Sequence, residues 1–99
     1  MVRIRELHWR QDREDHMIQR HGVYPVEVEE AIFYDRRGYF EKAGPAQRNP
    51  RETVYEHFGR TIEGRYLMTV LLYEEGDEAM PVTSREMDQA ERRRYERRS

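Results

Sequence analysis

Two arginines at the ends of a short turn are the residues whose type and spacing most directly suggest chemistry. Arg60 and Arg65 flank residues 61–64, which have the length of a hairpin loop between two strands. In such a hairpin the two arginines would face each other, and like charges placed opposite each other are destabilising. A bound phosphodiester would offset the repulsion, because guanidinium groups clamp phosphate and stabilise charge that develops on it. Neutralisation by Glu63 or another carboxylate is the alternative interpretation.

A third arginine is expected on the same rim of the sheet. Arg85 follows a predicted strand over residues 79–83, which would lie beside the strand that begins at Arg65. The three arginines together would form a cationic site suited to a phosphorus centre. The alternative is that Arg85 pairs with an acidic residue close to it in the chain, such as Glu86 or Glu91.

The C-terminal run over residues 91–98 contains five arginines and is expected to be helical. Arg92 and Arg93 are candidates for contact with a nucleic-acid backbone, such as that of RNA, or with an acidic protein partner, and Tyr95 is a candidate hydroxyl aimed at the site. Two alternatives stay open. The run is an exposed helix face whose charges form i, i+4 ion pairs, and Tyr95 is an anchor that holds this helix against the sheet.

Histidines supply the candidates for proton transfer. His21 and His57 are possible general bases, because the ordinary pKa of histidine lies near neutrality. His21 could instead cap its helix, and His57 could be a structural residue of a strand. The four histidines show none of the spacings typical of metal ligands, so we expect neither a metal site nor a cofactor.

Composition limits the class of protein. The chain of 99 residues is expected to form a single domain, residues 1–99, with a thin core, since 38% of its residues are charged and 36% hydrophobic. A net charge of −2 gives the whole chain no general attraction to nucleic acid, so an RNA site requires a local cationic patch. The absence of cysteine, of a signal sequence and of a long apolar run predicts a cytoplasmic protein that makes no contact with a membrane.

Periodicity and turn residues predict an α+β fold with an antiparallel sheet of three to four strands, two N-terminal helices and one C-terminal helix. Gly22 is expected to end the first helix, Pro25 to begin the second, and Asp88 with Glu91 to form a capping box at the start of the third. The apolar run over residues 66–73, which contains one threonine, predicts the central strand. A short first strand is expected over 2–9, and the strands of the antiparallel sheet are expected over 52–60, 65–74 and 79–83, with 37–42 as a possible edge strand. The expected helices are 12–21, 25–34 and 88–98, and 42–51 is the expected loop.

Several short blocks in this order resemble the BrnT family of bacterial ribonuclease toxins, which belongs to the RelE-like toxins. These blocks are Trp9, Arg20-His21-Gly22-Val23, an acidic helix from Glu27 to Phe33, Gly59-Arg60, Gly64-Arg65, Thr83-Ser84-Arg85, and Glu91-Arg92 with Tyr95. The resemblance implies a RelE-like fold, RNA cleavage without a metal, inhibition of translation, and neutralisation by a cognate antitoxin with a ribbon-helix-helix part, in a homo- or hetero-oligomer.

Two functions follow as hypotheses. The first is a metal-independent endoribonuclease in which Arg60, Arg65 and Arg85 stabilise the transition state and His21 or His57 transfers the proton. The second is a non-catalytic, divergent member that acts as a protein-binding module. The segment 44–51 favours the second hypothesis, because it lacks the acidic residues and histidines that the family usually carries there.

Overall fold

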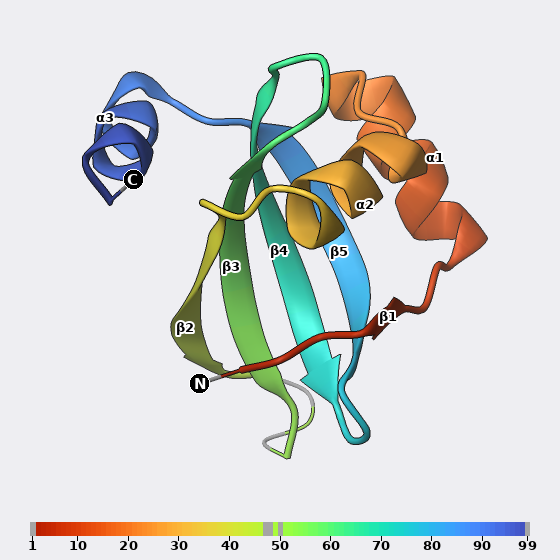
Figure 1. Ribbon diagram of the computed structural model, residues 1–99. Helices are drawn as coiled ribbons and strands as arrows, with labels where there is room; N and C mark the ends of the chain where they lie inside the picture. Colours follow the sequence, from red (N-terminus) through yellow and green to blue (C-terminus); the bar gives the residue numbers. More distant parts are fainter. Residues whose placement is uncertain (1, 47–48, 50, 99) are drawn as a thin grey trace.

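The computed structural model describes residues 2–46, 49 and 51–98, which form an α+β domain of three helices and one five-stranded sheet (Figure 1). The elements follow one another as β1 (Glu6–Leu7), α1 (Gln11–His21), α2 (Pro25–Phe33), β2 (Tyr39–Pro45), β3 (Thr53–Arg60), β4 (Tyr66–Glu74), β5 (Glu78–Glu86) and α3 (Gln89–Arg98). Each helix in the described part of the chain is too short or too polar to span a lipid bilayer.

The sheet has the order β1-β5-β4-β3-β2, so β4 is the central strand, as its apolar run predicts. The prediction of an antiparallel sheet with three to four strands is wrong, because β1 adds a fifth strand that runs parallel to β5. Only two residues of the predicted first strand pair in this way, Glu6 with Glu78 and Leu7 with Ala79. The sheet is therefore mixed.

Strand β2 forms the other edge of the sheet and is longer than predicted. It continues to Pro45, so the expected loop over 42–51 is wrong in its first part. The register with β3 shifts between Lys42 and Gly44, and Gly44 has a φ of 128°, a conformation that favours glycine. Residues 47, 48 and 50 of the expected loop lie outside the described residues.

Local signals place all three helices. Gly22 ends α1 in the left-handed conformation, with a φ of 63°, and Pro25 is the first residue of α2. At the start of α3, the backbone N–H of Glu91 donates to the Asp88 carboxylate at 2.8 Å, and the N–H of Asp88 donates to the Glu91 carboxylate at 2.9 Å. This reciprocal pair is the predicted capping box.

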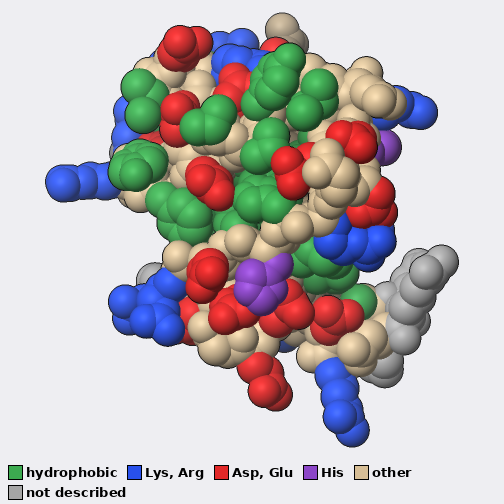
Figure 2. Space-filling model, turned by 90° about the vertical axis from the view of Figure 1, so that its right-hand side faces the viewer, with side chains coloured by type: hydrophobic (Ala, Val, Ile, Leu, Met, Phe, Trp, Pro, Cys, Tyr) green, Lys and Arg blue, Asp and Glu red, His purple; other side chains and the backbone are tan. Residues whose placement is uncertain are grey.

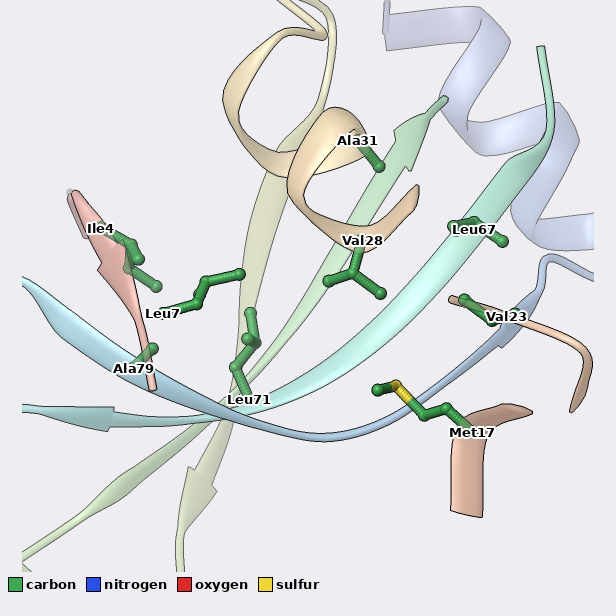
Figure 3. Packing of buried hydrophobic residues seen from close by; sticks show 9 residues of the cluster. All are labelled: Ile4, Leu7, Met17, Val23, Val28, Ala31, Leu67, Leu71 and Ala79. Carbon is green, nitrogen blue, oxygen red and sulfur yellow. The ribbon is translucent and has the colours of Figure 1, made fainter. Parts of the chain in front are cut away.

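The two faces of the sheet carry separate hydrophobic clusters. Helices α1 and α2 cover one face, where Met17, Val28 and Leu71 pack in the main core (Figure 3). Helix α3 lies on the opposite side of the sheet (Figure 1), where Tyr95 packs with Phe58 and with other residues of a smaller cluster. Burial on both faces explains why the sequence of β4 does not alternate cleanly.

Candidate functional site

The pairing of β3 with β4 places Arg60 and Arg65 differently from the prediction. Arg60 pairs with Tyr66 across β3 and β4, so the expected apposition of Arg60 and Arg65 is wrong. Arg65 instead closes the turn: its carbonyl accepts from the N–H of Thr61 at 2.9 Å, and its own N–H donates to the Thr61 hydroxyl at 2.9 Å. The like charges are therefore never placed opposite each other on one face.

Arg65 is bound to carboxylates on the side of the sheet that α2 covers. Its Nη1 donates to both oxygens of Glu27 at 2.8 and 2.9 Å and to the carbonyl of Gly22 at 3.0 Å, and its Nη2 donates to Glu86 at 2.9 Å. Burial works to lower the pKa of Arg65, but the hydrogen bonds to Glu27 and Glu86 outweigh it and raise the pKa above its ordinary value. These contacts tie the β3–β4 turn to α2.

Arg85 is also held by a carboxylate, on the opposite side of the sheet. Its two terminal nitrogens donate to the two oxygens of Glu91 at 2.8 and 3.0 Å, and Nη1 also donates to the carbonyl of Glu86 at 3.0 Å. The hydrogen bond to Glu91 raises the pKa of Arg85, and the same bond lowers the pKa of Glu91. The local pairing offered as the alternative for Arg85 is what the structure contains.

The structure therefore does not form the predicted clamp of three arginines. The side chains of Arg60 and Arg85 are on the face that carries α3, but they come from strands separated by β4, and Arg85 is in register with Phe58 rather than with Arg60. Arg65 reaches to the other face. Arg65 and Arg85 would each have to leave a carboxylate before either could bind a phosphate.

Arg60 has a different environment. Its guanidinium lies 4.7 Å from the centre of the Tyr66 ring, and the guanidinium of Arg92 lies 4.1 Å from the same ring. Within the described residues no carboxylate pairs with the Arg60 side chain, and its buried Nε has no hydrogen-bond partner. We call the space beside it the Arg60 cavity, of about 290 Å³, lined by Glu30, Tyr34, Asp35, Arg37, Arg60, Thr61, Ile62 and Tyr95.

Asp35 organises this cavity and was missed by the sequence analysis. It accepts the Tyr95 hydroxyl at 2.5 Å, the N–H of Arg60 at 2.7 Å and the N–H of Arg37 at 3.0 Å. Burial, together with the hydrogen bond to Asp35, raises the pKa of Tyr95 well above its ordinary value. An Asp side chain that accepts from the backbone two residues later is typical of turns, so the sequence could have indicated the bond to Arg37. No residue near Asp35 in the sequence indicates its contact with Tyr95. The anchoring role proposed as one alternative for Tyr95 agrees with its 1% exposure.

The two candidate histidines lie outside the Arg60 cavity. His57 is 1% exposed, and burial lowers its pKa to about 4. Its ring packs against Phe40, with the two centroids 4.6 Å apart, which agrees with a structural role. His21 is exposed at the end of α1, and its pKa is lowered by partial burial and then by the neighbouring positive groups His16 and Arg20.

Helix α3 brings arginines onto aromatic rings of the sheet. Besides Arg92 on Tyr66, Arg94 lies 5.4 Å from the ring centre of Phe58 and Arg98 lies 3.9 Å from that of Tyr39. Arg93 occupies an exposed position. In contrast, a view onto the side of the molecule that carries α1 and α2 shows mainly acidic and hydrophobic side chains, with basic ones at the margins (Figure 2). The arginines of α3 thus form a local cationic patch.

Neither a search for metal-binding groups nor a comparison with known proteins assigns a function to the site. In the described ranges, histidine and acidic side chains form no group of three that could hold a metal ion. The chain matches no protein-family model, and no curated protein matches it.

Proposed function

We propose that the protein is a metal-independent endoribonuclease toxin of the RelE-like class, with Arg60 as its principal phosphate contact. The observation that supports this proposal most is the environment of the Arg60 side chain. Of the three arginines singled out in the sequence, it alone has no carboxylate partner among the described residues, and it lines a cavity next to an arginine-rich helix. A guanidinium in this state can bind an incoming phosphate without first losing an ion pair.

The chemistry would be transesterification within the RNA strand. The 2′-oxygen attacks the adjacent phosphorus, the 5′-oxygen leaves, and a 2′,3′-cyclic phosphate remains. Arg60 would stabilise charge on the non-bridging oxygens, and Arg92 would hold a neighbouring phosphate. His21 does not line the Arg60 cavity, so in this scheme water accepts the proton of the 2′-hydroxyl and supplies a proton to the leaving 5′-oxygen. His57 has no part in this scheme, since its ring is buried.

The biological setting is part of the same proposal. The ordered blocks that resemble BrnT toxins support a cytoplasmic toxin that inhibits translation and is neutralised by a ribbon-helix-helix antitoxin, in a complex of the two proteins. The order of two helices before the main strands and one helix after them is the one predicted from the periodicity and turn residues of the sequence.

The test is RNA cleavage in the presence of EDTA. The purified protein should cleave a long RNA and leave 2′,3′-cyclic phosphate ends, and Arg60→Ala should lower the rate about 10²- to 10³-fold, the loss typical of one oxyanion contact. Arg97→Ala is the matched control, because it removes the same charge from an exposed position of α3 that has no assigned role and should retain most of the rate. Equal rates for Arg60→Ala and the parent would refute the assignment of Arg60.

The protein-binding module is the second candidate, and one observation favours it. Arg65 and Arg85 are both neutralised by carboxylates, so two of the three expected catalytic cations serve the fold. A protein that leaves RNA intact in the same assay, at concentrations where it is folded, would support this second function and refute the first.

A further inference from the structure

A second cavity lies at the β2 edge of the sheet and shares no lining residue with the Arg60 cavity. It has a volume of about 750 Å³, within the range of ligand pockets in proteins. We call it the edge groove. Its lining residues are Val2, Gly38, Tyr39, Phe40, Lys42, Tyr55, Tyr73 and Arg98.

Aromatic rings from three adjacent strands line the edge groove. Phe40 of β2 meets Tyr55 of β3 edge to face, with centroids 6.3 Å apart, and Tyr55 meets Tyr73 of β4 in the same way at 6.0 Å. All three side chains are partly exposed. A row of accessible rings is the surface on which single-stranded nucleic acids stack their bases, because every base has a π-face.

The charged side chains that line the edge groove are all basic. Lys42 and Arg98 are exposed, and none of the described residues that line the groove is acidic. This differs from the Arg60 cavity, whose lining includes Glu30 and Asp35. A groove with aromatic walls and two cations that form no ion pair within the described residues is complementary to a ligand that is both anionic and aromatic.

Helix α3 connects the two cavities. Arg92 lies on Tyr66 beside Arg60, and Arg98 lines the edge groove. Six residue steps separate Arg92 from Arg98, which correspond to roughly 9 Å along a helix axis, with Arg94 in between over Phe58. A line of guanidinium groups thus runs from the proposed phosphate site to the edge groove.

We propose that the edge groove binds a single-stranded segment of RNA that extends from the nucleotides at the Arg60 cavity. Bases stack on the rings of Phe40, Tyr55 and Tyr73, and Lys42 and Arg98 contact phosphates. This inference rests on the proposed function for the identity of the ligand, and it adds the substrate class: an unpaired strand, since bases in a duplex cannot reach these rings.

Affinity for an RNA that cannot be cleaved tests the groove apart from catalysis. The probe is a fluorescein-labelled 2′-O-methyl oligouridylate, followed by anisotropy at several salt concentrations. The double variant Lys42→Ala/Arg98→Ala should bind at least tenfold more weakly, and its salt slope should fall by roughly 1.4, or about 0.7 for each lost phosphate contact on a single strand. Lys42→Ala/Arg97→Ala is the matched control, because Arg97 is exposed on the same helical turn but does not line the groove. This control variant should lose only the part of the affinity and of the salt slope that is due to Lys42.

A chemical footprint provides the second readout. Lys42 is the only lysine in the chain, so acetylation of its amine can be followed on one peptide by mass spectrometry. Saturating 2′-O-methyl oligouridylate should slow this acetylation severalfold in the parent, and a duplex of the same length should not. Tyr73→Leu should weaken protection while circular dichroism confirms that the variant is folded.

The outcomes separate this inference from the proposed function. Protection of Lys42 by the single strand in a protein that cleaves no RNA supports the groove and refutes the nuclease. Cleavage that depends on Arg60, with no protection and no effect of Lys42→Ala/Arg98→Ala, overturns the groove and leaves the nuclease. Protection by an acidic, tyrosine-containing peptide but not by RNA also overturns it, because the groove would then be a protein site.

Discussion

The Tyr95 hydroxyl donates to the Asp35 carboxylate at 2.5 Å, and this bond joins the C-terminal helix to the turn that follows α2. The same carboxylate accepts the backbone N–H of Arg60, so one acidic side chain fixes both the helix and the last residue of β3. The position of Arg92 over Tyr66 depends on α3 being held there. Asp35 and Tyr95 are therefore positioning residues for the cationic face.

Removing the Tyr95 hydroxyl should destabilise the protein. Tyr95→Phe keeps the buried ring but removes a hydrogen bond to a charged group, and we expect a loss of about 2 kcal/mol in the free energy of unfolding. Tyr66→Phe is the control: its hydroxyl bonds to Glu96 at an exposed position at 3.3 Å, so its loss should be below about 0.5 kcal/mol. Urea denaturation measures both. Equal losses would show that the Asp35 bond is no stronger than a surface bond.

Stability should depend on the protonation of His57 over a defined range of pH. Burial lowers the pKa of His57 to about 4, below its ordinary value of 6.5, so the unfolded chain binds this proton more readily than the folded one. The contribution of neutral His57 to the free energy of unfolding is therefore complete above pH 6.5. It decreases as the pH falls from 6.5 towards 4, by at most about 3 kcal/mol. NMR titration of the His57 ring should show no transition above pH 5. A transition near pH 6.5 would contradict the buried, neutral state.

The helices and the central strand were predictable because their signals are local. Gly22, Pro25 and the Asp88–Glu91 box act within one turn of helix, and the apolar run of β4 reports burial on both faces. The parallel pairing of β1 was not predictable, since nothing in Glu6 or Leu7 specifies a partner strand near the other end of the chain.

In the candidate site, too, only contacts between residues close in the sequence were predictable. The pairing of Arg85 with Glu91 was foreseen as an alternative because the two residues are six positions apart. Arg65 binds Glu27, 38 positions away, and this ion pair depends on how α2 crosses the sheet. The prediction of a clamp failed at this step: a hairpin loop of four residues was assumed, whereas hydrogen bonds between Thr61 and Arg65 place Arg65 inside the turn.

The state of the three arginines predicts different consequences for their loss. Arg65→Ala leaves the half-buried Glu27 carboxylate without its partner, which should cost about 1 to 3 kcal/mol and lower the melting temperature by several degrees. RNA cleavage by the variant at a temperature where it is folded should stay within tenfold of the parent rate. Arg60→Ala should show the reverse, a large loss of cleavage with an almost unchanged melting temperature. If cleavage is lost equally in both variants while both stay folded, Arg65 takes part in the reaction.

Gly59 sets how closely β3 approaches α2, and this gives the last prediction. A Cβ atom at position 59 would lie 2.6 Å from the carbonyl oxygen of Ala31 and 2.6 Å from Cε1 of His57, so either the helix or the buried ring must move. Gly59→Ala should therefore destabilise the fold by about 2 to 3 kcal/mol, the cost typical of overpacking. Gly76→Ala is the control, because a Cβ there meets nothing within 4 Å and the only cost, about 1 kcal/mol, is that of its positive φ of 77°. Thermal unfolding of the two variants would show whether contact with α2, rather than backbone conformation, determines the need for glycine at position 59.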